Sequence, residues 1–419
     1  MNAPVFKPPR LPTAPHASRQ RGFTLVELMV SLTGGLFLSI VVFALARDGQ
    51  RFYQRESRLA NATLAGISGF DRLRADIARA GFLTSPNLNA DPRVCSRPDA
   101  VPWPAQLGAL RSVTVNTSPP VPTALANNGI TPHRILLAGS YASTEEFPIR
   151  SFSLNPAGGA QQLFLQVNSG AMARLGYLTS TTPQALLVSV FGLGRAIRLV
   201  DREGMQHYAV ISAVTGGTNP SITLAPNPSI TLRSGAAKQC GAKGFETGAT
   251  VNVVNFIQYD VASMSANANY AKLFTLSAAA PGENQRTELV RIELDAAGAP
   301  IAGTQELVAE YAVDLRFGLT GITGVVGSNP TVGAIPAGQF TAFAGTAGNA
   351  QRLRAVRARL SVRSREPDRE ANVGIGPTVA AGLYRFMVVP AQPGVPAQFA
   401  RVRTFQADIA LHNHTRILW

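Results

Sequence analysis

Glu27 is the one charged residue in an apolar run that extends from Phe23 to Ala46. As a helix this run would reach about 36 Å, which is enough to cross the ~30 Å hydrocarbon core of a bilayer. A carboxylate buried at that depth costs roughly 2.5–3.5 kcal/mol on insertion scales, so it is by default a candidate for function. A secretory signal peptide would have a shorter apolar core closed by a small-residue cleavage site. The run therefore predicts a membrane-spanning helix with a functional acid.

Catalytic constellations are missing from the sequence. It contains no Gly-x-Ser-x-Gly elbow, Walker loop, His-Glu-x-x-His run or Cys-x-x-Cys pair. His412 and His414 have the spacing of metal ligands on one face of a strand, but two histidines without a third ligand nearby are more often surface residues. We therefore expect no enzymatic activity, no metal and no cofactor.

Two cysteines, Cys95 and Cys240, lie in loop-like sequence. For a domain outside the cytoplasm, an even count favours a disulfide over two independent thiols. Closing so long a loop would stabilise the fold by about 4–5 kcal/mol in the chain-entropy model. We expect the bridge.

Arginine alternates with apolar residues between Arg354 and Arg365, in a chain of net charge +14 and isoelectric point near 10.6. Three partners fit this basic face: the carboxylates of Asp71 and Asp76, an acidic partner subunit, or DNA phosphates. The aromatic residues of a single-strand platform are missing. Internal pairing is therefore favoured, a partner subunit comes second, and DNA is the least favoured.

A long helix must position Glu27. Apolar residues recur at threes and fours after the apolar run, and Gly81 is a plausible end signal, which predicts one helix over 23–81. Asp71 with Arg74, and Asp76 with Arg79, have the spacing of helical ion pairs.

Beyond Phe82, short apolar runs alternate with Pro, Gly, Asn, Ser and Thr, which is typical of a β-rich region. The fold class expected is α+β: a long N-terminal helix packed on a large, mainly antiparallel β-rich head. Residues 318–350 are rich in Gly, Thr and Ala and are predicted to be a surface loop or insertion. The predicted strands are 134–138, 162–167, 185–191, 197–200, 207–211, 251–261, 272–276, 289–294, 307–317, 356–363, 384–389 and 403–411.

The N-terminal segment carries a specific pattern: a basic leader, then Gly22, Phe23, Thr-Leu-Val, Glu27 and a long apolar helix. This pattern resembles the processing signal of type IV prepilins. The resemblance implies cleavage by prepilin peptidase between Gly22 and Phe23, N-methylation of Phe23, and a role for Glu27 in assembly. A new α-amine at Phe23 would be a cation in an apolar setting, and a carboxylate one turn away or on a neighbouring subunit can neutralise it.

Later segments resemble PilW-type minor pilins. They are residues 72–82, 306–317, 353–364 and 402–413. The first of these also occurs in pseudopilins of type II secretion, so the order of all four favours the PilW type. The middle of the chain, about 85–250, resembles no family.

The resemblance implies four parts: a cleaved cytoplasmic leader (1–22), a transmembrane and assembly helix (23–46), its amphipathic continuation (47–82) and a periplasmic head (83–419). The chain would be a minor pilin that moves from the inner membrane into the pilus. Its expected partners are prepilin peptidase, other minor pilins, the major pilin, the inner-membrane assembly platform and membrane lipid. The alternatives are a type II secretion pseudopilin, which a smaller head and calcium-ligand clusters would favour, and a pilus-tip binding module for adhesion or DNA uptake.

Overall fold

The computed structural model describes residues 24–95, 103–153, 161–230, 248–275, 283, 286–323, 331–343, 348–367 and 385–415. The chain forms two compact units, Met1–Ser57 and Arg58–Trp419. The predicted leader lies outside the described residues. The boundary at Ser57 falls inside the long helix, between the predicted ends of its membrane and amphipathic segments.

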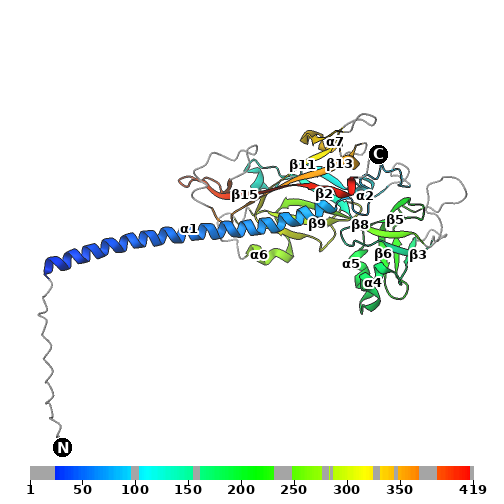
Figure 1. The fold of residues 1–419 in the computed structure, drawn as a ribbon, viewed down its shortest axis with the longest axis horizontal. Helices are drawn as coiled ribbons and strands as arrows, with labels where there is room; N and C mark the ends of the chain where they lie inside the picture. Colours follow the sequence, from blue (N-terminus) through cyan, green and yellow to red (C-terminus); the bar gives the residue numbers. More distant parts are fainter. Residues whose placement is uncertain are drawn as a thin grey trace, which may run out of the picture. The chain divides into compact units, whose positions relative to one another are not determined.

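Helix α1 spans Leu25–Arg79, as the apolar periodicity predicts (Figure 1). In the first unit those of its side chains that the structure describes are exposed. In the second unit Phe70, Leu73 and Ile77 are buried. The helix stops at Gly81, whose φ of 77° is left-handed and whose N–H donates to Ala138 O at 2.9 Å.

The rest of the second unit contains two antiparallel sheets, which confirms the α+β fold class. The first sheet, of ten described strands, contains β1 Val113–Asn116, β2 Arg134–Gly139, β3 Phe147–Ser153, β4 Gln162–Leu165, β5 Ala196–Val200, β6 Gln206–Thr215, β7 Ser221–Leu224, β8 Thr250–Ala262, β9 Glu288–Leu294 and β10 Glu306–Ala309. The second contains β11 Ala312–Ile322, β12 Val332–Ile335, β13 Leu353–Arg363, β14 Arg385–Val389 and β15 Gln398–Ala410, in the order β12-β11-β13-β15-β14.

Part of the first sheet closes into a barrel. Following the pairings from β8 through β3, β4, β7, β6 and β5 leads back to β8. Buried side chains such as Phe147, Leu163 and Val251 form a core for these strands, separate from the core under α1. The helices α4 Gly170–Arg174 and α5 Pro183–Val190 add Met172 and Leu187 to it, and both lie beside the barrel strands in Figure 1.

The barrel is an insertion in a hairpin. β2 pairs with the second half of β8, and the last pair of that ladder joins Gly139 to Asn255. The first half of β8 pairs with β3 and β5 instead. One strand therefore belongs to both parts: the barrel insert (residues 140–254) and the remaining head, which we call the frame.

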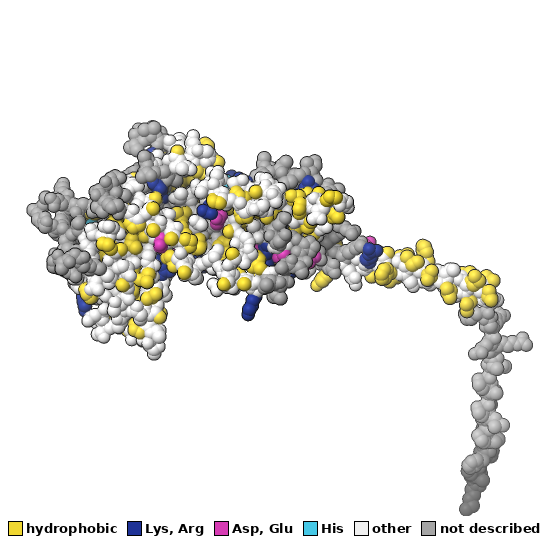
Figure 2. All heavy atoms as spheres, turned by 180° about the vertical axis from the view of Figure 1, so that it is seen from behind, with side chains coloured by type: hydrophobic (Ala, Val, Ile, Leu, Met, Phe, Trp, Pro, Cys, Tyr) yellow, Lys and Arg dark blue, Asp and Glu magenta, His cyan; other side chains and the backbone are white. Residues whose placement is uncertain are grey.

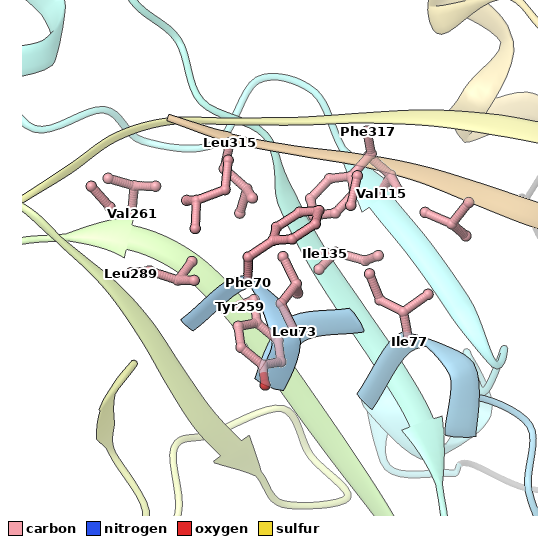
Figure 3. Packing of buried hydrophobic residues seen from close by; sticks show 14 of the residues in the cluster. Phe70, Leu73, Ile77, Val115, Ile135, Tyr259, Val261, Leu289, Leu315 and Phe317 are labelled. Carbon is pink, nitrogen blue, oxygen red and sulfur yellow. The ribbon is translucent and has the colours of Figure 1, made fainter. Parts of the chain in front are cut away.

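The second half of α1 packs in the core of the frame. Phe70, Leu73 and Ile77 lie among side chains of both sheets, including Tyr259 and Leu315 (Figure 3).

Two helix glycines permit this approach. A Cβ at Gly66 would collide with the ring of Phe405. One at Gly69 would lie 2.6 Å from Ala309 Cβ and 2.8 Å from Val308 O.

Four expectations about local structure are wrong. Residues 185–190 of the predicted strand 185–191 belong to α5, where Pro183 occupies a favourable first-turn position, and 272–275 belong to α6 Ala271–Thr275. Short apolar runs do not distinguish a strand from a buried helix. The predicted strand 307–317 is broken at Tyr311, where a φ of 55° lets the chain pass from β10 in the first sheet to β11 in the second. The region 318–350 contains the end of β11, its hairpin partner β12 and helix α7 Phe340–Phe343.

Candidate processing and assembly site

The described chain begins one residue after the predicted cleavage point. Gly22 and Phe23 lie outside the described residues, so their roles stay predictions. Thr24 and Glu27 form a capping box at the start of α1. The backbone N–H and the hydroxyl of Thr24 each donate to Glu27 Oε2 at 3.1 Å, and Glu27 N–H donates to Thr24 Oγ1 at 3.3 Å.

This geometry holds the carboxylate at the helix N-terminus. Unpaired N–H groups make that end electropositive, and a carboxylate there is stabilised. The carboxylate bonds to the amide next in the chain after Phe23, where cleavage would create an amine. We did not expect a role for Thr24 from the sequence, although its spacing, Thr-x-x-Glu, is the signature of a capping box.

The helix beyond this site suits a membrane. Leu25–Gln50 has a mean hydropathy of 2.3, none of it is buried by the protein, and it is long enough to cross a bilayer. Figure 2 shows hydrophobic side chains along this part of α1. The hydroxyls of Ser31, Thr33 and Ser39 donate to helix carbonyls at 2.8–3.0 Å. Such bonding removes donors that would be costly in lipid.

A second polar site fixes the other end of α1 to the frame. Asp76 Oδ2 accepts from Arg291 Nε and from the Tyr259 hydroxyl, both at 2.8 Å, and only 4 % of Asp76 is exposed. Burial and the neighbouring Asp76 raise the pKa of Tyr259. Burial has the largest single effect on the pKa of the Arg291 guanidinium and lowers it, but the charge and hydrogen bond of Asp76, together with Tyr259 and Glu306, make the net shift upward.

The predicted helical pairing of Asp76 with Arg79 is therefore wrong. Arg79 Nη2 donates to Ser140 O at 2.8 Å and its guanidinium lies over the ring of Tyr141. Tertiary partners on β8 and β9 replace the local partner because burial strengthens them.

The basic face of β13 is paired inside the head, but not with the predicted acids. Arg357 Nε donates to Asp408 at 2.7 Å, and Arg359 lies 3.5 Å from Asp314. Burial raises the pKa of Asp314 although two arginines oppose the shift. Arg363, expected on the same face, is fully buried. Asp76 is occupied by Arg291.

The remaining candidate residues are the two cysteines and the two histidines. Cys95 is buried and disulfide-bonded; Cys240 lies outside the described residues, so the pairing stays a prediction. The two histidines lie in the 3-10 helix η8 His412–His414, not on a strand.

His414 is not a surface residue as expected. It is buried, with Nε2 2.6 Å from Ser112 Oγ. Burial, helped by Arg354, lowers its pKa to about 4. Among the described residues no group of three His, Cys, Asp or Glu side chains could hold a metal ion.

Comparison with known proteins supports a processing signal at the N-terminal end of the chain. Residues 17–33 match the model of the prokaryotic N-terminal methylation motif. This motif, followed by an apolar helix, supports a processed, membrane-anchored protein of the type IV pilin or pseudopilin kind. The motif implies cleavage by prepilin peptidase and assembly with other pilins. No curated protein and no solved structure matches the chain.

Proposed function

We propose that the chain is a minor pilin that takes part in initiating or assembling a type IV pilus, in a minor-pilin complex at the pilus tip. Prepilin peptidase would cut between Gly22 and Phe23 and methylate the new amine of Phe23. The head would be periplasmic until assembly. The observation that carries the proposal is the methylation motif continuing, without a break, into an exposed apolar helix that ends inside a large head.

In this proposal Glu27 recruits the subunit. Its carboxylate would neutralise a pilin N-terminal amine in the apolar filament core, where an unpaired charge is costly. The capping box supports this role because it holds the acid at the helix start. The contacts of Asp76 near the C-terminal end of α1 would hold the head to the same helix.

The decisive experiment is N-terminal mass analysis of the membrane-extracted chain, from cells with and without prepilin peptidase. A mature chain that begins with methylated Phe23, seen only with the peptidase, supports the proposal. An uncut chain in both strains contradicts it.

The role of Glu27 is tested by Glu27→Ala, with Glu56→Ala on the exposed part of α1 as the control. Recovery of Glu27→Ala in sheared pili at the level of Glu56→Ala would contradict recruitment by charge.

The barrel insert favours one second candidate, a binding module at the pilus tip. It has its own core, and its chain enters and leaves the frame at one hairpin. Its surface away from Ser140 and Tyr141, which contact Arg79 and Asp76 of α1, can therefore vary without disturbing α1. Purified pili with and without this chain would be compared for binding of double-stranded DNA at increasing salt. Binding that needs the chain and falls steeply with salt supports a DNA receptor; equal binding excludes one.

A further inference from the structure

Among the described strands of the frame, β15 is left unpaired along most of one edge. β13 pairs with it from Val402 to Ala410, but on the other side β14 pairs only from Gln398 to Arg401. The N–H of Leu411 donates to Arg354 O, and that of Ser364 to Arg401 O, both at 2.8 Å. Because such bonds recur at every second residue, odd-numbered residues of β15 bond to β13.

The even-numbered residues Thr404, Gln406, Asp408 and Ala410 therefore direct their backbone groups to the open side. No described strand pairs with them there. A row of unpaired N–H and C=O groups is a template for another strand.

This edge forms one wall of a groove of about 410 Å³. Asp71, Arg74, Ala75 and Ala78 of α1 form the opposite wall, and His412 also lines the groove. The wall on α1 continues a stripe that begins with the exposed side chains of Leu64 and Ile67, at spacings of three and four residues.

The geometry points to an occupant with an extended backbone. A neighbouring strand would lie ~4.8 Å from β15, with alternate side chains directed over Ala75 and Ala78. A helix is about 10–12 Å across and bonds its own backbone groups internally, so it could not complete the edge.

Two charged side chains on the groove wall restrict which strand can bind. Asp71 and Arg74 are exposed, and neither has an ion-pair partner among the described residues. A strand with a basic side chain opposite Asp71 and an acidic one opposite Arg74 would satisfy both.

We propose that an edge strand from the head of a neighbouring pilin-like subunit adds to β15 in this groove, against the outer stripe of α1. The inference rests on the proposed function, because pilin assembly brings heads together along their helices. The contact would fix which subunit follows this chain, since both backbone register and the two wall charges must match.

Gln406→Pro tests the edge. It removes an outward N–H while leaving the β13 ladder intact. Ala334→Pro is the matched control: the Thr323–Thr331 bond shows by the same parity that Ala334 directs its N–H away from β11, on an edge without this groove. We expect recovery of full-length Gln406→Pro in sheared pili to fall at least about fivefold relative to Ala334→Pro, as loss of a strand hydrogen bond with steric exclusion implies.

A photo-crosslinking residue at Thr404 in otherwise wild-type chain gives the second readout. A crosslinked peptide from the head of another subunit with the methylation motif is expected. Crosslinks only within this chain or to lipid would overturn the proposal. Equal recovery of the two proline variants, both cut before Phe23, would overturn the docking while leaving the proposed function intact; failure of cleavage in wild type would overturn the function itself.

Discussion

The two halves of α1 have the same backbone and opposite environments. Gly34, Gly35 and Gly49 in the first half have no atom within 4 Å of the position that a Cβ would occupy, whereas Gly66 and Gly69 in the second half are in direct contact with the frame. Leu45 is exposed and Leu73 is fully buried. One half is therefore shaped for contacts outside this chain, and the other already has its partners. Paired substitutions along the helix can test this difference.

Asp76→Ala should have the largest effect. It leaves the buried Arg291 guanidinium and the Tyr259 hydroxyl without their main partner, which typically costs about 3–5 kcal/mol of unfolding free energy. Asp71 is exposed and lies about one turn earlier in the helix, so Asp71→Ala should change the unfolding free energy by less than about 0.5 kcal/mol. Denaturant unfolding of the detergent-solubilised chain measures both, and similar values would refute the anchoring role.

Acid should have the second largest effect, by destabilising the fold around His414 near the C-terminal end of α1. The pKa of His414 is about 4 in the fold and about 6.5 unfolded, so the folded state binds fewer protons between these values. The stabilisation is complete above pH 6.5 and is lost as pH falls toward 4, up to about 3 kcal/mol.

His133, with its pKa also lowered to about 4 by burial, adds in the same direction. The fall in melting temperature with decreasing pH should be smaller in His414→Gln than in the wild-type chain. The exposed neighbour supplies the control: His412→Gln should leave the profile unchanged.

Gly69→Ala should cost about 1–3 kcal/mol, because the new methyl group collides with Val308 backbone and Ala309. The methyl group of Gly49→Ala would contact no other atom, so this variant should stabilise the local helix by up to about 1 kcal/mol. Unfolding of the head reports the first change, and circular dichroism reports the second. Equal head stability in both variants would contradict the close packing.

Thr24→Val should have the smallest effect. Loss of its hydroxyl removes half of the capping box and should cost the helix start about 0.5–1 kcal/mol, with no change in head unfolding. Faster amide exchange at Glu27 is the expected signal. An unchanged rate would show that the cap contributes nothing there.

Sequence periodicity predicted α1 and most strands of the frame, since each has a long apolar pattern of its own. It could not predict the barrel, because closure depends on which strands pair. In addition, β7 has only four residues, and a register shift between Ile149 and Ser151 interrupts the alternation of β3. The processing residues were recognisable as a linear motif. The anchor was not: Arg291 lies 215 residues from Asp76, and only the fold brings them together.

The Gly139–Asn255 pair has an evolutionary consequence. Paired residues in an antiparallel ladder lie only about 5 Å apart, so the two ends of the insert meet at one point on the frame. A tight turn could close the same gap, and so could a different cassette. Lineages carrying this frame could therefore exchange the insert, provided that the replacement keeps the contacts that Ser140 and Tyr141 make with Arg79 and Asp76 of α1.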